Sequence, residues 1–401
     1  MSDSPRPQSG WRVPVRRILI VLASAIAACV ALGVGGLLLP GLPVVGTLGT
    51  MVWSMMLVPL MLLAILGLVS ALVAWKLGVR RMGVIVSAVT VLSLVGSSVV
   101  LGDQLTTASR YEVDANLASA LSPAVYGDSG QPDATLEYGT DDGEPLELDL
   151  YRPVETEDPA PVVVYVHGGG WIIGDKAAQS SNLEWFAEQG YLAAGINYTL
   201  ATEDHATWDT AMPQVACGLG WLAEHAAEYG GDPDRIFVYG ESAGGALTLG
   251  TSYALAAGEL EPWCDTEIPS IRAVAAQVPA VDPVSFYDND DDVLGDWSRE
   301  MVSHYLGGTP SEHPDRVAVV SPINYLDPAV TPPTLVFTSE SDHLVPVAGV
   351  DEFISEATDA GIDLTVVRRN FSDHTVDLQY GGIPNQLVLQ LMDRHFRANG
   401  A

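Results

Sequence analysis

The stretch Gly240-Glu241-Ser242-Ala243-Gly244 matches the pattern G-x-S-x-G. In that pattern a serine sits on a sharp turn between a strand and a helix, where its hydroxyl can attack a carbonyl carbon. On its own the match is weak, because small residues also gather in ordinary tight turns. Here the apolar run "RIFVYG" precedes the serine and the small-residue helix start "AGGALTLG" follows it. This context predicts that Ser242 is a nucleophile.

A glycine-rich loop, "HGGGW" at residues 167–171, follows another apolar run, "PVVVYV". Three consecutive glycines leave backbone N–H groups free to approach a developing negative charge on an oxygen, with no side chains in the way. We expect the N–H groups of Gly168 and Gly169, together with that of Ala243, to form an oxyanion hole.

The two side chains at the ends of this loop have other expected roles. His167 is expected to fix the loop, because a general base must reach Ser242 from a loop near the end of the sheet. Trp171 is a candidate wall of the substrate pocket. A packed core tryptophan is the alternative, and the sequence leaves both open.

A serine hydroxyl is a poor nucleophile until an imidazole takes its proton, and the imidazole needs a carboxylate to fix its tautomer. The segment "TLVFTSESDHLVP" puts Asp342 just beyond one apolar run, and "LTVVRRNFSDHTVD" puts His374 beyond the next. The chain order is therefore Ser, Asp, His. We predict a catalytic triad of Ser242, His374 and Asp342.

Neighbouring residues compete for these roles. For the acid, Asp342 is favoured over Glu340 and Asp373 because it lies further into its loop and "LVP" follows it. For the base, His343 adjoins the acid and is therefore badly placed to bridge it to Ser242. The remaining histidines fall in connections or helical patterns and are expected to be surface or core residues: His205, His225, His304, His313 and His395.

These loops need a scaffold that brings them together. Short apolar runs alternate with helical patterns, which is typical of a mostly parallel sheet with helices on both faces, and sites form at the carboxyl ends of its strands. The segment 280–318 is long for a connection and is a candidate lid. The predicted strands are 146–151, which is antiparallel, then 161–167, 191–198, 235–240, 271–278, 334–339 and 364–369, with helices near 179–189, 207–229, 243–257, 347–360 and 384–398.

Charge divides the chain into two parts. Residues 1–101 carry a net charge of +6 and residues 102–401 carry −38. A surface as acidic as that of the second part repels phosphate backbones, so a nucleic-acid partner is excluded. We expect a membrane domain at 1–101, a linker or small cap at 102–133 and a catalytic domain at 134–401.

Three uncharged apolar runs fill the first part, at 18–39, 52–75 and 83–101. Each is long enough to cross a hydrocarbon core of roughly 30 Å as a helix. A signal peptide is the alternative for the first run and buried core helices are the alternative for the others. A signal peptide would not be followed by two further apolar runs, so three transmembrane helices are expected.

Basic residues set the expected orientation. They precede the first run and lie between the second and third, whereas the loop "PGLPVVG" between the first and second has none. Both basic segments should stay in the cytoplasm. An odd number of spans then places everything after Leu101 on the outer face of the cell membrane.

Cysteines and acidic clusters give little further chemistry. Cys29 lies in the first apolar run, whereas Cys217 and Cys264 lie in the outer part, where either a disulfide or two free thiols are possible. No H-E-x-x-H or C-x-x-C motif occurs. The acidic residues at 288–292 lack the glycine and distal glutamate of a calcium loop. We expect no metal and no cofactor.

With these motifs in place, the chain resembles the α/β-hydrolase fold, and within it the carboxylesterases similar to hormone-sensitive lipase. The resemblance covers roughly 135–398 and rests on "HGGGW", "GINYTLA", "GGDPDRIFVYGESAGG" and "SPINYLDPAVTPPTLVFTSESDHLVP". The last segment also resembles feruloyl-esterase-like hydrolases with D-x-x-V-P after the acid. The resemblance implies the same triad and oxyanion donors. This chain departs from it with "YTLATE" for "YRLAPE" and "HTV" for H-G-F, which affects substrate class more than mechanism.

The sequence thus predicts a membrane-anchored serine hydrolase that cleaves small-molecule or lipid carboxylic esters through an acyl-enzyme. An acyltransferase or deacetylase acting on envelope lipid or polysaccharide is one alternative. A non-catalytic adhesion or scaffold module on a hydrolase fold is another. Acyl-chain specificity and oligomeric state do not follow from the sequence.

Overall fold

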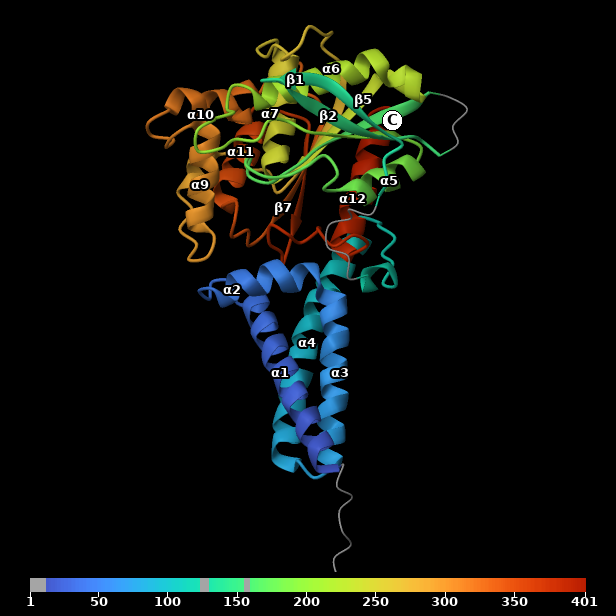
Figure 1. Cartoon of the computed structure of the whole chain (residues 1–401), viewed down its shortest axis with the longest axis vertical. Helices are drawn as coiled ribbons and strands as arrows, with labels where there is room; N and C mark the ends of the chain where they lie inside the picture. Colours follow the sequence, from blue (N-terminus) through green and yellow to red (C-terminus); the bar gives the residue numbers. More distant parts are fainter. Residues whose placement is uncertain (1–11, 123–129, 155–158) are drawn as a thin grey trace, which may run out of the picture.

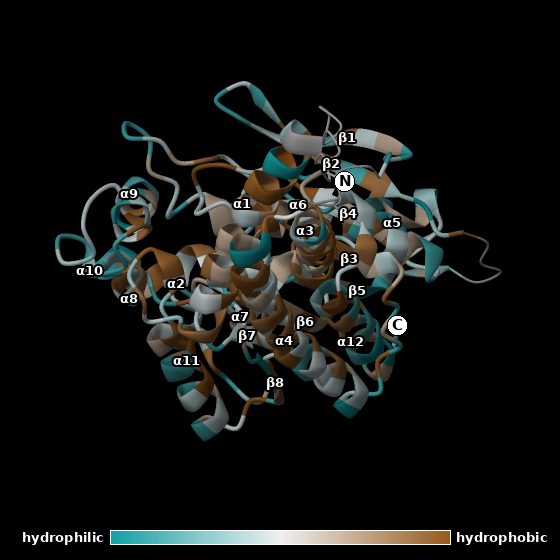
Figure 2. Cartoon of the chain, turned by 90° about the horizontal axis from the view of Figure 1, so that it is seen from below, coloured by the Kyte–Doolittle hydropathy of each residue, from teal (hydrophilic) through white to brown (hydrophobic). Residues whose placement is uncertain are grey.

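The computed structural model describes residues 12–122, 130–154 and 159–401. It has two parts, a bundle of three long helices and an α/β domain that sits on one end of the bundle (Figure 1). The bundle consists of α1 (Arg12–Leu38), α3 (Leu57–Lys76) and α4 (Arg80–Arg110). All three helices are long and apolar enough to cross a membrane. Seen along the bundle from below, they carry mostly hydrophobic residues (Figure 2).

The helix bounds differ from the predicted spans at two places. The second helix begins at Leu57, although the apolar run begins at residue 52. The third continues past Leu101 to Arg110, so one unbroken helix crosses the predicted boundary between the membrane domain and the linker. Hydropathy marks where a helix is apolar, whereas its ends depend on contacts. Leu57 packs in the bundle core, and Ala108 near the end of α4 packs in a core of the α/β domain.

The segment between α1 and α3 forms a platform, which we define as residues 40–54. It contains one turn of α-helix, α2 (Val45–Leu48), and one π-helical turn, η1 (Gly49–Trp53). It lies across the end of the bundle, between the bundle and the α/β domain (Figure 1). Trp53 is 4% exposed and packs in the bundle core with Val34, Leu37 and Leu57. The platform is therefore part of the folded bundle and also the surface on which the α/β domain rests.

Eight strands form one sheet in the order β1-β2-β4-β3-β5-β6-β7-β8. The β1 and β2 strands pair antiparallel with each other, β2 pairs antiparallel with β4, and the remaining pairs are parallel. The predicted fold class, a mostly parallel sheet flanked by helices, is confirmed. The strands are β1 (Ala134–Asp141), β2 (Glu144–Tyr151), β3 (Ala160–Val166), β4 (Leu192–Ile196), β5 (Gly231–Glu241), β6 (Ile271–Gln277), β7 (Thr334–Ser339) and β8 (Leu364–Arg369).

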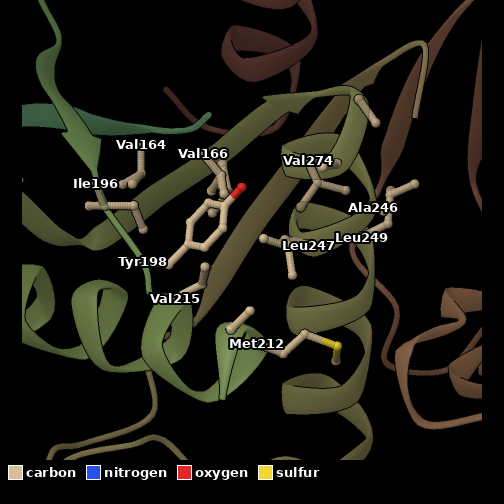
Figure 3. Close-up of a cluster of buried hydrophobic side chains, with 14 of the residues drawn as sticks. Val164, Val166, Ile196, Tyr198, Met212, Val215, Ala246, Leu247, Leu249 and Val274 are labelled. Atoms are coloured by element: carbon tan, nitrogen blue, oxygen red, sulfur yellow. The ribbon is translucent and has the colours of Figure 1, made fainter. Parts of the chain in front are cut away.

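Helices bury both faces of the sheet. On one face lie α6 (Ala211–His225), α7 (Ser242–Ala257) and α11 (Val347–Asp359), and on the other lie α5 (Ser180–Glu188) and α12 (Ile383–Ala398). Figure 3 shows the first core, where Val164, Val166 and Val274 of the strands meet Leu247 and Leu249 of α7. The central strands are hydrophobic throughout because both of their faces are covered.

The connections outside the sheet are also ordered. The segment predicted as a candidate lid contains α8 (Pro283–Tyr287), α9 (Gly295–Leu306) and α10 (Pro314–Val320), whose apolar residues join the core on the α7 side. The remaining elements are the 3-10 turns η2 (Ser119–Leu121), η3 (Ala226–Tyr229) and η4 (Pro322–Tyr325). Within the predicted linker, the backbone N–H groups of Asp114 and Asn116 donate to the side chains of Gln390 and Gln386 on α12. This part of the predicted linker is therefore fixed to the α/β domain.

Cys217 of α6 and Cys264 form a disulfide, which resolves the alternatives that the sequence left open. The two cysteines are 47 residues apart and the bond ties α6 to the loop before β6. Cys29 is a free thiol.

Opening the disulfide should destabilise the α/β domain. A crosslink across a loop of this length contributes about 4 kcal/mol in the chain-entropy model. We expect Cys217→Ala/Cys264→Ala to melt several degrees below the wild type, and dithiothreitol to lower the wild-type melting temperature without changing that of the double variant. Cys29→Ser is the matched control and should melt like the wild type. A wild-type melting temperature insensitive to dithiothreitol would contradict the assignment.

Candidate active site

Ser242 occupies a strained turn at the end of a central strand. The β5 strand ends at Glu241 and α7 begins at Ser242, with no residue between them. Ser242 has a φ of 54°, in the left-handed region that serine rarely adopts. Around it, a Cβ at Gly240 would overlap the carbonyl group of Gly244, and a Cβ at Gly244 would overlap the carbonyl oxygen of Val166. Only glycine lets strand and helix approach this closely, as the sequence motif predicts.

His374 and Asp342 lie on the loops that follow β8 and β7. Their side chains meet at 2.9 Å between His374 Nδ1 and Asp342 Oδ2. The other carboxylate oxygen of Asp342 accepts from the backbone N–H groups of Leu344 and Val345, at 3.0 and 2.8 Å. The carboxylate is thus held in place, and because it accepts at Nδ1, the Nε2 atom of His374 is left free to take a proton.

Two opposing effects set the pKa of His374. Burial lowers this pKa, but the charge and hydrogen bond of Asp342 raise it, as do the nearby charges of Asp373 and Glu241, and the net pKa lies above the ordinary value of 6.5. The β5, β7 and β8 strands lie in one parallel array with β6. The three predicted triad residues therefore stand at the same edge of the sheet. Among the described residues Ser242 makes no hydrogen bond to His374, a contact that in free enzymes often forms only with substrate bound.

The "HGGGW" loop lies against the serine turn. A Cβ at Gly168 would come within 3.3 Å of the Ser242 Cβ and 3.0 Å of the Glu241 carbonyl oxygen. Gly169 and the following glycine have φ of 104° and 60°, so this backbone path favours glycine. The N–H of Ala243 belongs to the first turn of α7, whose N–H groups have no acceptor within the helix. Gly168 therefore lies beside Ser242, and the oxyanion hole stays a prediction.

His167 fixes the loop. Its Nδ1 contacts the Gly168 carbonyl oxygen at 2.8 Å and its ring stacks on Tyr198 at 4.3 Å. The Tyr198 hydroxyl donates in turn to the His167 carbonyl at 3.0 Å. Burial lowers the pKa of His167 to about 4, so the ring is neutral at physiological pH. It serves as a packing and hydrogen-bonding residue.

Trp171 lies in the core, which is the second of the two alternatives left open above. Its side chain is 1% exposed and stacks on Tyr305 of α9 at 4.3 Å, with Phe286 of α8 at 5.9 Å. It reaches this position because the backbone at Trp171 also takes a positive φ, of 63°. The ring therefore anchors the "HGGGW" loop to the helices of segment 280–318.

Glu241, the variable residue of the serine motif, is a site residue that the sequence analysis missed. Its carboxylate accepts hydrogen bonds from Tyr165, at 2.9 Å, and from Gln179. Burial raises the pKa of Glu241 to about 7, with the Asp377 charge adding to the effect. Its side chain also packs beneath Gly168. Glu241 thus links the serine turn, the strand β3 and the oxyanion loop.

Asp373, which the sequence analysis considered only as a rival acid, binds the two catalytic loops together. Its carboxylate is fully buried. It accepts the backbone N–H of His374 at 2.7 Å, the backbone N–H of His343 at 3.0 Å and the His343 Nδ1 at 2.6 Å. A fourth donor is the hydroxyl of Thr50, which comes from the platform. No local sequence signal connects Thr50 with Asp373, because 323 positions separate them.

His343 is positively charged in this arrangement. Its Nδ1 faces the Asp373 carboxylate, and its Nε2 faces the carbonyl oxygen of Pro40 at 3.2 Å. Both partners only accept hydrogen bonds, so both ring nitrogens must carry protons. Burial lowers the pKa of His343, but Asp373 and the other acceptors outweigh it and raise the pKa to about 9. His343 therefore bridges the platform and the loop of Asp342.

Comparison with known proteins identifies the family and the fold. The BD-FAE family model matches residues 148–356, slightly more than half of the chain, and the chain belongs to this family. It is 29% identical over 231 residues to the esterase LipQ of Mycobacterium tuberculosis, covering 56% of this chain and 52% of LipQ. It is 30% identical over 256 residues to the probable carboxylic ester hydrolase LipM of the same organism, covering 61% and 56%. The chain thus spans about half the length of these two curated relatives.

Solved structures extend the comparison to the fold. The propionate-bound esterase Est2 of Thermogutta terrifontis superimposes with a TM-score of 0.54 at 25% identity, covering 67% of this chain and 94% of that one. A bacterial heroin esterase gives a TM-score of 0.54 at 24% identity, covering 66% and 84%, and shows the fold alone. The predicted resemblance to α/β-hydrolase carboxylesterases is confirmed.

The glycines of the serine turn can be tested directly. Gly244→Ala forces a methyl group onto the carbonyl of Val166. Misplacing a reacting group by about 1 Å costs on the order of a hundredfold in rate, so we expect esterase activity to fall at least that far. Gly102→Ala is the matched control, because a Cβ there meets nothing within 4 Å. Wild-type activity in Gly244→Ala would contradict the close approach of strand and helix.

Proposed function

We propose that the chain is a serine hydrolase that cleaves carboxylic esters through an acyl-enzyme, with Ser242 as nucleophile, His374 as general base and Asp342 as its partner. The observation that carries the proposal is the 2.9 Å contact between His374 and Asp342 on the loops after β8 and β7. That pair stands at the edge of the sheet where β5 presents a serine in a strained turn. The names of LipQ, LipM and Est2 support ester hydrolysis.

In the first half-reaction, the Ser242 oxygen attacks the ester carbonyl carbon while its proton passes to Nε2 of His374. The carbonyl oxygen becomes an oxyanion, which accepts hydrogen bonds from the N–H groups of Gly168, Gly169 and Ala243. When this intermediate collapses, the bond to the alcohol oxygen breaks and His374 returns the proton to it. The alcohol leaves, and the acyl group stays on Ser242.

In the second half-reaction, His374 takes a proton from a water molecule, whose oxygen attacks the acyl carbon. Collapse of the second intermediate breaks the bond to Ser242, and His374 gives the proton back to the serine oxygen. The carboxylic acid leaves and the site is restored. Asp342 keeps the imidazole oriented and stabilises its charged form in both half-reactions, and no cofactor or metal takes part.

We further propose that α1, α3 and α4 span the cell membrane and that the α/β domain lies outside. The three helices have the required length and composition. Basic residues cluster at the bundle end remote from the α/β domain, at Arg16, Arg17 and Lys76 to Arg81, as expected for a cytoplasmic end. The Cys217–Cys264 disulfide supports the same orientation, because disulfides persist in oxidising compartments.

The nucleophile can be tested by Ser242→Ala. Without the hydroxyl no acyl-enzyme forms, so we expect turnover of p-nitrophenyl acetate and butyrate to fall by about 10³-fold or more, with an unchanged melting temperature. Ser270→Ala, at an exposed serine before β6, is the matched control and should keep full activity. Hydrolysis by Ser242→Ala at the wild-type rate would remove the proposal.

The pH dependence of kcat/KM tests the base. His374 must be neutral to accept the serine proton, and its pKa in the folded protein is raised above 6.5. Activity should therefore be full above this pKa and decline as the pH falls through it, so the midpoint of the acid limb should lie above 6.5. The profile is measured after subtracting hydrolysis by Ser242→Ala at each pH. A midpoint below about pH 6 would show that the interaction with Asp342 does not outweigh the effect of burial on the pKa of His374.

A further inference from the structure

The platform, residues 40–54, has two unlike faces. Thr47 and Thr50 are buried and donate to Asp291 and Asp373 of the α/β domain, whereas the buried Gly46 and Gly49 lie against Pro40 and α1. Apart from Trp53, which is buried in the bundle core, four large apolar side chains of the platform are exposed by roughly half. These are Leu42 at 43%, Val44 at 46%, Leu48 at 53% and Val52 at 44%. This is the reverse of an ordinary surface helix, whose apolar residues are buried and whose polar residues meet water.

The buried face of the platform holds the catalytic loops. Besides the bonds of Thr50 to Asp373 and of His343 to Pro40, the Thr375 hydroxyl donates to the Met51 carbonyl at 2.7 Å. Thr375 directly follows His374. Thr47 donates to Asp291, in the loop before α9, at 2.9 Å. Three separate loops at the carboxyl edge of the sheet thus rest on one short segment.

An apolar contact strengthens this attachment. Phe371, three residues before His374, packs against the end of the bundle core formed by Val34, Trp53 and Val100, among others. Next to it, Asn370 donates to Asp103 of α4 at 3.1 Å. The loop of His374 is therefore fixed to the bundle by Phe371 and Asn370 as well as to the platform by Thr375. The edge of the sheet that carries the catalytic residues faces the bundle (Figure 1).

The exposed apolar side chains of the platform are continuous with those of α1 and α3, which run directly into it. Lipid is the occupant that this continuity favours, because the platform joins two helices of membrane-spanning length. Beside it, Val293 and Trp297 are 40% and 38% exposed and follow the Asp291 that Thr47 binds. Exposed tryptophan beside a membrane span is typical of the lipid–water boundary.

We propose that the platform lies in the outer surface of the bilayer and that the active site takes its ester from that leaflet. The substrate class is then an amphiphilic ester whose hydrocarbon chain remains in lipid while its carbonyl reaches Ser242. The proposal rests on the serine hydrolase function proposed above. It follows from the position of the platform. This one segment contacts the loops of Asp342 and His374 and also carries the exposed apolar side chains.

The test uses the full chain reconstituted in phosphatidylcholine vesicles. p-Nitrophenyl palmitate, which exchanges slowly between vesicles, is placed either in the enzyme's own vesicles or, in the same total amount, in separate enzyme-free vesicles. We expect the initial rate to be at least about tenfold higher in the first arrangement. Equal initial rates would overturn the proposal, because the ester would then be reaching the site through water.

Water-soluble p-nitrophenyl acetate separates this outcome from a failure of the proposed function. If the acetate is hydrolysed while the two palmitate arrangements give equal rates, the hydrolase function stands and supply from the membrane is wrong. If neither ester is hydrolysed beyond the Ser242→Ala background, the hydrolase function itself is wrong. Both esters are measured in the same vesicle preparation.

A distance measurement gives an independent answer. Ser242 is labelled with a fluorescent fluorophosphonate in the reconstituted chain, and the lipid carries a nitroxide on its headgroup. We expect the label to be quenched at least about twofold more than a maleimide label of the same fluorophore at Ser270→Cys in a Cys29→Ser background. Ser270 is exposed and lies at the amino end of β6, away from the catalytic edge. Equal quenching at the two positions would overturn the proposal.

Discussion

The arrangement of the loops around the candidate site depends on the buried carboxylate of Asp373. A charge in that position is stable only when its hydrogen bonds are satisfied, and here the donors come from three parts of the chain. His374 supplies a backbone N–H, His343 supplies a backbone N–H and a charged ring, and Thr50 supplies a hydroxyl. The requirement of one carboxylate therefore fixes the loop of His374, the loop of Asp342 and the platform relative to one another.

This arrangement connects the helix bundle with the candidate site. A tether alone would need one apolar helix and no contact with the catalytic loops. Here Pro40, Thr50 and Met51, which join two of the apolar helices, bind residues next to Asp342 and His374. The bundle thus supplies part of the support that a triad needs to keep its geometry. This support is a role for the three-helix bundle beyond anchoring, for which one helix would be enough.

Much of the fold and the residues of the candidate site could be predicted from local patterns. The strand before Ser242, the glycines around it and the strand-end positions of Asp342 and His374 are visible in short stretches of sequence, because turn geometry and burial act locally. The β1 strand was not predicted, since its residues are mostly partly or fully exposed and form no apolar run. The role of Thr50 could not be predicted, because its partner Asp373 is close only in the folded chain. The platform was missed for a related reason: its first part, "PGLPVVG", was interpreted as a loop between two apolar runs and its last three residues as the start of the second run. Only packing shows where α3 begins.

The central claim is that Ser242 carries the acyl group during turnover. The most direct measurement is to mix the full chain with p-nitrophenyl acetate, stop the reaction with acid within the first turnovers, and map the peptides by mass spectrometry. The account predicts the mass of one acetyl group on the peptide that contains Ser242, and on no other peptide in proportion to the p-nitrophenol released. Release of p-nitrophenol with the acetyl group on a different residue, or with no acetylated peptide at any early time, would contradict it.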